Sequence, residues 1–308
     1  MLDVPHLRVL LAVAQHRSIS AAAHALSYSQ SAVSRRITAL EHDVGTPLLL
    51  RGSRGVRPTP AGEALIEHAR VVMRQLALAE ERIRALAGAA GGQLRLGAFA
   101  SANAGIVPEL FRRFSRRHPA VRLSLCAGGP ADHLAALRAG ELDLALVTEW
   151  DLAGERFDGL SLLRLMTDEQ YVALPAGHRL AGPGPIGLPE LREETWIEGA
   201  HPDCLGPLRE LCLGLGFEPR VGLHCDDWYG KQRLVAAGVG IGLFPALAVP
   251  GLAPGLALRS LGGHFPPRDV YLVLPDEDSR APATGPLTAV LMELVAEEPA
   301  APTPLQDR

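Results

Sequence analysis

Apolar residues recur at alternating spacings of four and three between residues 65 and 86, and this repeat constrains the fold more than any other feature. The repeat consists of Leu65, Ala69, Val72, Leu76, Ala79, Ile83 and Leu86. Thr59-Pro60 is a typical helix start, and only Gly62 interrupts residues 60–87. A strict 3.5-residue period is typical of a coiled-coil seam, so it predicts a helix roughly 40 Å long that pairs with a second copy. A helix packed only against its own domain is the alternative.

This helix divides the chain into a short and a long part. Three glycines in Gly88-Ala89-Ala90-Gly91-Gly92 predict a flexible hinge directly after it. The 308 residues are enough for about two domains. We therefore expect a first domain over 1–59, a linker helix over 60–87, a hinge over 88–92, a second domain over 93–298 and a disordered tail over 299–308.

Charge is distributed unevenly between the two parts. Residues 1–60 carry seven arginines and three acidic residues, a net charge of +4 in a chain whose total is −4. A small basic end on an acidic body indicates a nucleic-acid-binding module joined to another function. The sequence contains no long apolar run, no signal sequence and no C-x-x-C pair among its four cysteines. We therefore expect no membrane segment, no metal site, no cofactor and a cytoplasmic location.

The first sixty residues predict three short helices followed by two extended segments. Ser18 is placed to cap the second helix, and the third runs from about Ser29 to Val44 before Gly45. The third helix has an apolar stripe and an opposite polar face formed by Gln30, Ser31, Ser34, Arg35 and Thr38. Gln pairs well with an adenine edge and Arg with a guanine edge, so this face predicts base contacts in a helix-turn-helix. A solvated helix face is the alternative.

Residues 46–59 read as two extended pieces around a Gly-Ser-Arg-Gly turn. Arg54 lies at the tip of this small wing, where an arginine suits phosphates or a narrow minor groove. An ordinary solvated turn is the other interpretation.

In this order, the features closely resemble the winged helix-turn-helix of LysR-type transcriptional regulators. The matching segments are 18–23, 26–37, 40–41, 45–49, residue 51 and 59–62. The chain departs from the family pattern at Ser31, often Pro, at Leu49, usually Phe, and at Pro58, usually Leu. Ser31 replaces a rigid helix start with a hydroxyl, so the preferred DNA sequence is expected to differ.

The resemblance implies double-stranded operator DNA, further copies of the chain in a dimer or tetramer, a small-molecule effector and RNA polymerase as partners. The DNA-binding residues that it implies, together with those of the polar face, are Ser18, Ser29, Gln30, Ser31, Ser34, Arg35, Arg36, Thr38, Arg51 and Arg54. The residues expected in the dimer seam are Leu65, Val72, Leu76, Ile83 and Leu86.

The C-terminal part alternates between expected strands and helices in two similar passes, over about 93–147 and 196–244. The first pass reads as βαβαβ, which predicts a parallel sheet with helices on both faces. In the second pass a helix is expected over 232–237 and a strand over 239–244. Extended segments near 162–175 and 256–275 are expected to cross between the halves, and a last helix over 286–297 to return to the first.

Two such halves resemble the periplasmic-binding-protein-like effector domain of the same family, with Leu234-Val235-Ala236-Ala237-Gly238-Val239-Gly240 as a typical match. The expected fold is therefore α/β, with an all-α winged helix-turn-helix before two α/β subdomains. Subdomain I is expected over about 93–164 and 272–298, and subdomain II over about 165–271.

Ligands of open α/β sheets bind at the carboxyl ends of the strands. The residues expected there are Ser101, Ala102, Asn103, Gly129, Thr148, His201, Asp227 and Trp228. A helix starting near Ser101 favours an anion, and the family's effectors are often small carboxylates or aromatics. Pro130 stands where the family commonly has Ser or Thr, which removes a donor. Ser101 as a plain cap, Trp228 in the core and Lys231 on the surface are the structural alternatives.

Three other functions compete with a ligand-responsive regulator. An α/β enzyme is one, but no G-x-S-x-G, P-loop or H-E-x-x-H motif occurs, so we expect no catalytic residue. A thiol-based sensor using Cys204 and Cys212 is another. Eight residues of helix would hold these cysteines about 12 Å apart, too far for a disulfide without unfolding. A constitutive DNA-binding protein without an effector is the third.

Overall fold

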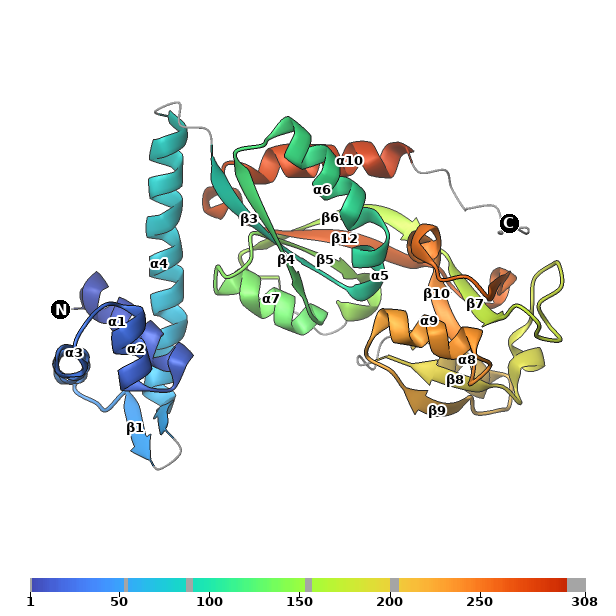
Figure 1. Ribbon diagram of the computed structural model, residues 1–308, viewed down its shortest axis with the longest axis horizontal. Helices are drawn as coiled ribbons and strands as arrows, with labels where there is room; N and C mark the ends of the chain where they lie inside the picture. Colours follow the sequence, from blue (N-terminus) through green and yellow to red (C-terminus); the bar gives the residue numbers. More distant parts are fainter. Residues whose placement is uncertain (1, 53–54, 87–90, 153–156, 200–204, 298–308) are drawn as a thin grey trace. The chain divides into compact units, whose positions relative to one another are not determined.

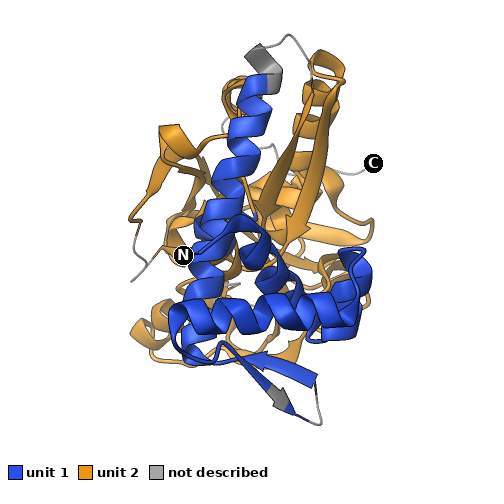
Figure 2. Ribbon diagram, turned by 90° about the vertical axis from the view of Figure 1, so that its left-hand side faces the viewer, with its two compact units in different colours: residues 1–89, 136–141 blue, residues 90–135, 142–308 orange. Residues whose placement is uncertain are grey.

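The computed structural model divides the chain into two compact units, which Figure 2 shows in different colours. Unit 1 contains residues 1–89 and 136–141, and unit 2 contains residues 90–135 and 142–308. The structure describes residues 2–52, 55–86, 91–152, 157–199 and 205–297. None of the helices in these ranges is long and apolar enough to cross a membrane.

Unit 1 is a three-helix module with a β-hairpin and one long helix. Its elements are α1 (Val4–His16), α2 (Ile19–Ala25), α3 (Gln30–Val44), β1 (Leu49–Gly52), β2 (Gly55–Pro58) and α4 (Pro60–Leu86). The two strands pair antiparallel, with Leu49 opposite Pro58. Ser18 caps α2 as the sequence predicts, because its side chain accepts from the Ala21 N–H, and Ser29, expected near the start of the third helix, caps α3 by accepting from the Ala32 N–H.

The turn between α2 and α3 depends on one left-handed residue. Ser27 has φ 56°, a conformation that few L residues adopt, and it lies among the four residues, 26–29, that separate the two helices. At the other end of α3, Gly45 has φ 72° and ends the helix. These two positions fix both ends of the segment that carries α3.

The hairpin is joined to the helices by polar side chains. Glu41 on α3 accepts from the backbone N–H groups of Leu48 and Leu49, at 2.8 and 3.2 Å. Thr59 donates to the carbonyl of Pro47 and accepts from the N–H of Gly62. A Cβ at residue 62 would lie 2.0 Å from the carbonyl oxygen of Leu48, so only glycine fits there. The Thr-Pro-Ala-Gly sequence therefore locks β1 against the first turn of α4.

The core of unit 1 contains apolar residues from every helix and from the hairpin. Its buried members include Leu10, Val13, Ala22, Val33, Ile37, Leu40, Leu48 and Ile66. Leu65 of α4 is partly buried against the same core, and Ala69 is buried. The first members of the heptad repeat therefore pack within their own domain. For this part of the helix, the structure agrees with the alternative interpretation, in which the helix packs only against its own domain.

Unit 2 contains a five-stranded sheet in the order β4-β3-β5-β12-β6 (Figure 1). Its strands are β3 (Gly92–Ala98), β4 (Val121–Ala127), β5 (Leu144–Thr148), β6 (Leu160–Asp168) and β12 (Arg268–Pro275). Its helices are α5 (Ala100–Ala104), α6 (Ile106–Arg117), α7 (Pro130–Arg138) and α10 (Thr284–Glu297). Helices α6 and α10 lie side by side, and Arg113 of α6 forms an ion pair with Glu297 of α10.

The second half of unit 2 has two smaller sheets, in the orders β10-β7-β11 and β8-β9. The strands are β7 (Gln170–Pro175), β8 (Thr195–Glu198), β9 (Arg220–His224), β10 (Gly242–Pro245) and β11 (Leu256–Ser260). The helices are α8 (Leu208–Gly214) and α9 (Trp228–Ala236). A parallel bridge between Trp196 and Ile241 connects the two sheets, and the fully buried Trp196 belongs to their shared core.

The structure confirms the parallel pairing expected for the first pass, adds an antiparallel strand to that sheet and shifts the expected subdomain boundaries. Strands β3, β4 and β5 are parallel, but β12 is antiparallel to both β5 and β6, so the large sheet is mixed. The chain crosses after Asp168 and returns before Arg268, so residues 165–168 and 268–271 belong to the first half. Both strands simply continue to pair with each other beyond the expected boundaries.

Helix α9 and strand β10 also begin elsewhere than expected. Helix α9 starts four residues before residue 232, because the Asp227 side chain caps it by accepting from the Gly230 N–H. Strand β10 starts at Gly242 rather than at Val239, since residues 237–240 form the turn that follows the helix.

Candidate nucleic-acid interface and ligand cavity

The polar face of α3 is on the surface of unit 1. Gln30, Ser31, Arg35 and Thr38 are exposed and Ser34 is half-buried, while Val33, Ile37 and Leu40 on the opposite side are buried. The Gln30 amide donates to the Ser20 hydroxyl at 2.7 Å, and Arg35 Nε donates to the Ser31 carbonyl at 3.3 Å. These bonds hold two long side chains over the face before any ligand arrives.

Three of the residues expected to contact DNA make interactions within unit 1. Ser18 and Ser29 cap α2 and α3, and the Ser29 and Ser31 hydroxyls share a hydrogen bond of 3.0 Å. The Arg36 guanidinium lies over the Tyr28 ring, 5.0 Å from its centre. At 100° per residue, Arg36 is on a different side of α3 from Gln30 and Ser34, so it does not share their face.

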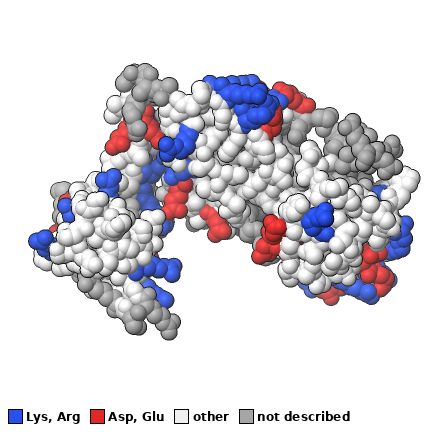
Figure 3. Space-filling view, viewed as in Figure 1, with Lys and Arg blue, Asp and Glu red and all other residues white. Residues whose placement is uncertain are grey.

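The tip of the wing lies outside the residues that the structure describes. Arg54 is outside the described residues, and Arg51 is described only as part of β1. Arg57 on β2 is exposed, and Figure 3 shows basic side chains on the surface of the helix-turn-helix part of unit 1. The described part of the wing thus presents an exposed cation, Arg57.

The later members of the heptad repeat are exposed. Val72, Leu76 and Ile83 show 40%, 42% and 65% of their surface, unusually high for large apolar side chains on one helix side. Leu86 lies on α4, but its side chain is outside the described part. The seam left uncovered in the single chain therefore begins at Val72, after the residues that pack into the domain core.

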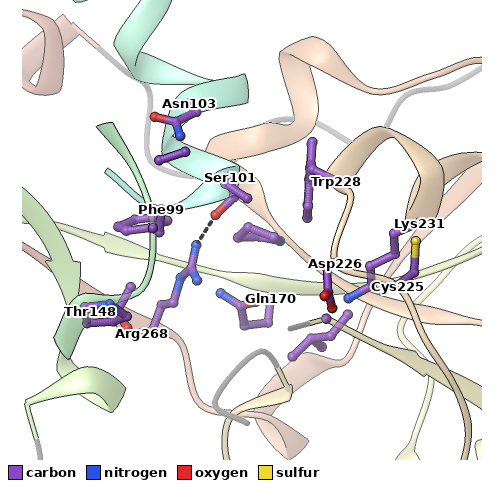
Figure 4. A pocket seen from close by; sticks show the side chains of 17 residues that line it. Phe99, Ser101, Asn103, Thr148, Gln170, Cys225, Asp226, Trp228, Lys231 and Arg268 are labelled. Atoms are coloured by element: carbon purple, nitrogen blue, oxygen red, sulfur yellow. Dashed lines mark hydrogen bonds between the residues drawn. The ribbon is translucent and has the colours of Figure 1, made fainter. Parts of the chain in front are cut away.

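A cavity of about 430 Å³ lies within unit 2, at the carboxyl ends of the strands (Figure 4). Its lining residues are Phe99, Ala100, Ser101, Asn103, Ala127, Gly128, Pro130, Thr148, Gln170, Gly199, Cys225, Asp226, Trp228, Lys231, Leu243, Pro245 and Arg268. Most of them lie at or just after the ends of β3, β4, β5, β8, β9 and β10, while Gln170 and Arg268 begin β7 and β12 and Lys231 lies on α9. This volume and mixture of polar and apolar side chains is typical of a small-molecule site.

The cavity brings together half of the effector contacts expected from the sequence. Ser101, Asn103, Thr148 and Trp228 line it. Ala102 and Gly129 are buried behind the wall, and the Asp227 side chain is occupied in capping α9. Their neighbours in the sequence line the cavity instead, Gly128 and Pro130 on either side of Gly129 and Asp226 before Asp227. His201 lies outside the described residues.

Two cationic residues of the cavity were not expected there. Lys231 is not a surface residue, because it is only 4% exposed and its Nζ lies 5.5 Å from the centre of the Phe244 ring. Arg268 starts strand β12 and has no sequence motif around it. The one available signal was a pair of charged residues, Arg268 and Asp269, directly before the apolar run of a buried strand.

Arg268 and Asp168 form a buried ion pair at the point where the two halves of unit 2 join. They are register partners on β12 and β6, and Arg268 Nε and Nη2 donate to Asp168 Oδ2 at 2.9 and 2.8 Å. The other oxygen, Asp168 Oδ1, accepts from the Leu247 N–H at 2.9 Å. Burial raises the pKa of Asp168 above its usual value, although Arg268 and these N–H donors act in the opposite direction.

Two polar atoms of lining residues are buried without a hydrogen-bond partner, namely Asn103 Oδ1 and Trp228 Nε1. Buried polar atoms in folded proteins are nearly always paired, so these two atoms are exceptions in the wall around the cavity, although neither is itself accessible from it. Among the residues that the structure describes, no cluster of His, Cys, Asp and Glu is suited to hold a metal ion.

The cysteines lie in different environments. Cys212 is 1% exposed, and burial raises the pKa of its thiol to about 11. Cys225 is half-buried at the cavity wall, and Cys126 is exposed. Cys204 lies outside the described residues. Because the thiolate is the reactive form, Cys212 is held in its inert state.

Comparisons with known proteins match both units. Residues 4–63 match the profile of the bacterial regulatory helix-turn-helix protein, lysR family, and residues 87–296 match that of the LysR substrate binding domain. The chain is 31% identical to the HTH-type transcriptional regulator XapR of Escherichia coli (strain K12) over 294 residues, 94% of this chain and 98% of that protein.

Two solved structures of full-length proteins share the fold. One is CbnR complexed with its target DNA, with a TM-score of 0.69 and 24% identity over 96% of this chain and 99% of that chain. The other is a cysteine-to-aspartate variant of OxyR from Pseudomonas aeruginosa, with a TM-score of 0.72 and 22% identity over 98% of this chain and 100% of that chain.

Proposed function

Because this chain belongs to the LysR family of transcriptional regulators, we propose that it reads operator DNA with α3 and senses a small anionic or aromatic metabolite in the cavity of unit 2. The family consists of regulators rather than enzymes. The observation that carries the proposal is the polar face of α3, which is exposed while its apolar side is buried. CbnR, which shares the fold, was crystallised with its target DNA.

The proposed assembly is a dimer, or a tetramer built from dimers, joined through the exposed seam of α4. Two copies would present two α3 helices to two half-sites, which is the usual symmetry of dimeric helix-turn-helix proteins. Binding to DNA places the protein in the cytoplasm, and RNA polymerase is the partner on which a regulator of transcription would act. The domain limits proposed above follow the same division, with the helix of 60–87 between the DNA-binding and effector domains.

Footprinting of the purified protein on the region upstream of its own gene tests the proposal. We expect protection of at least two half-sites about one helical turn apart, and protection that weakens as salt is raised. Protection without sequence preference would contradict the proposal of a sequence-specific regulator. So would the absence of binding, at any salt concentration, to every fragment of a genome-wide library.

Gln30→Ala is expected to weaken operator binding by about 1–3 kcal/mol and to relax the base preference at one position of each half-site. The reason is that the Gln30 amide is exposed on α3 and held in place by Ser20. Binding-site selection with the variant measures both effects. The control is Gln15→Ala on α1, which removes an exposed amide elsewhere in unit 1. An unchanged base preference for Gln30→Ala would remove Gln30 from the base contacts.

The redox-sensing alternative uses a thiol that the structure shows to be buried. We expect iodoacetamide at about pH 8, near the ordinary thiol pKa, to leave Cys212 of the native protein unmodified while Cys126 and Cys225 react. Mass spectrometry of the digested protein measures the labelling. Hydrogen peroxide is expected to leave DNA affinity unchanged. Rapid labelling of Cys212, together with a peroxide-dependent change in affinity, would restore the redox sensor.

A further inference from the structure

We propose that Arg268 is the residue that selects the ligand of the cavity, by binding its carboxylate together with the Ser101 hydroxyl. The inference rests on the proposed function, since it concerns the effector site. It adds a specificity-determining residue from strand β12, outside the loops at the strand ends where the sequence places the ligand contacts.

The first argument is that Arg268 keeps donors available at the cavity. Its bonds to Asp168 and Ser101 use Nε and Nη2. A guanidinium has five N–H groups in a fixed plane, and the two on Nη1 have no hydrogen bond to any residue in the described ranges. Because Arg268 lines the cavity and lies 5.0 Å and 5.7 Å from the centres of the Phe99 and Trp150 rings, this plane is held rigidly.

The second argument concerns the direction of the bond to Ser101, which Figure 4 shows as a dashed line. Arginine has no acceptor, so Arg268 Nη2 must donate and the Ser101 oxygen must accept, at 2.9 Å. The hydroxyl hydrogen of Ser101 then points elsewhere, and no bond within the described part of the chain uses it. Arg268 and Ser101 together therefore offer a cationic N–H pair and a neighbouring O–H, which match the oxygens of a carboxylate.

The third argument is that other sources of positive potential on this side are weak. Helix α5 has only five residues, so its dipole is small, and its Ser101 depends on Arg268 for orientation. Helix α7 begins with Pro130, which has no N–H to offer. Asp168 is fully buried behind Arg268, and both of its oxygens accept bonds, so it fixes the guanidinium instead of competing for the cavity.

The test compares carboxylates with their uncharged amides. The probes are benzoate and benzamide, salicylate and salicylamide, and 3-phenylpropionate and 3-phenylpropionamide, each titrated to about 10 mM by ligand-observed NMR, which detects millimolar dissociation constants. We expect at least one carboxylate to bind the full-length protein and its amide to bind about 10- to 100-fold more weakly, because a hydrogen bond to a charged group is lost.

The variant is the double substitution D168N/R268Q, which replaces the ion pair by two amides and leaves neither of its two charges unpaired. It is expected to remove the larger part of the preference for the carboxylate, because Lys231 is then the remaining cation of the described cavity lining. The control R259Q removes another buried arginine of unit 2, which donates to the Leu180 and Gly184 carbonyls and does not line the cavity. It is expected to keep the preference.

Operator binding by all three proteins is measured in parallel. If the wild type binds no operator, the proposed function fails. The inference on Arg268 is overturned if the operator is bound but no carboxylate binds, if amides bind as well as carboxylates, or if D168N/R268Q keeps the preference.

Discussion

Leu76→Asp is expected to separate the two copies that we propose α4 joins, to halve the mass of the assembly, and to lower affinity for a two-half-site operator by about 10²- to 10⁴-fold. Leu76 is 42% exposed in the middle of the seam that continues to Ile83. A carboxylate there would face its counterpart across a dimer seam, where a buried charge is costly. Most of the loss in affinity comes from the two half-sites no longer being bound as one unit.

The chain offers a closely matched control for this substitution. Val71 is also 42% exposed, and at 100° per residue it lies about 140° around α4 from Leu76. Val71→Asp is therefore expected to leave both mass and affinity close to those of the wild type. Light scattering and an operator titration measure the two quantities. A Leu76→Asp protein of unchanged mass would show that α4 is not the dimer interface.

Asp168→Ala is expected to reduce the free energy of unfolding of unit 2 by about 3–5 kcal/mol, because it leaves the buried Arg268 guanidinium without its counter-ion. It also removes the acceptor of the Leu247 N–H. For a unit of this size, the melting temperature should fall by roughly 10 °C. Thermal unfolding followed by calorimetry measures the loss.

A second ion pair joins the same two strands and provides the control. Arg164 of β6 pairs with Asp269 of β12 at 2.6 Å, but Arg164 is half exposed to solvent. Asp269→Ala is expected to change the melting temperature little, because exposed pairs are screened and cost little to break. Equal losses for the two substitutions would show that burial of the Asp168–Arg268 pair contributes nothing special to the stability of unit 2.

Features of the fold that depend on short-range chemistry were visible in the sequence. The caps at Ser18 and Ser29, the Gly45 helix end and the 4-3-4-3 repeat each involve residues within a few turns of one another. The Thr59–Gly62 motif is also local in the sequence. The structure adds why glycine is required at residue 62, because the carbonyl of Leu48 leaves no room for a Cβ there. For these features, local geometry is enough.

Local sequence patterns predict only some of the residues that line the candidate cavity. Ser101 and Thr148 were predicted because they follow strands, and strand ends meet at one edge of a sheet. Whether Asp226 or Asp227 faces the cavity depends on which of two neighbours caps α9, and the sequence does not distinguish them. Lys231 looked like a surface residue because nothing near it in the sequence indicates that Phe244 covers it.

The sequence by itself therefore determined the family, the helix-turn-helix with its polar face, and the long helix with an apolar seam, since each is a periodic or contiguous pattern. Only the tertiary structure decided that the seam is uncovered from Val72 onward, that β12 makes the large sheet mixed, and that Arg268 meets Asp168. The physical reason is distance along the chain. Arg268 and Asp168 are 100 residues apart, and neither carries a local signal of the other.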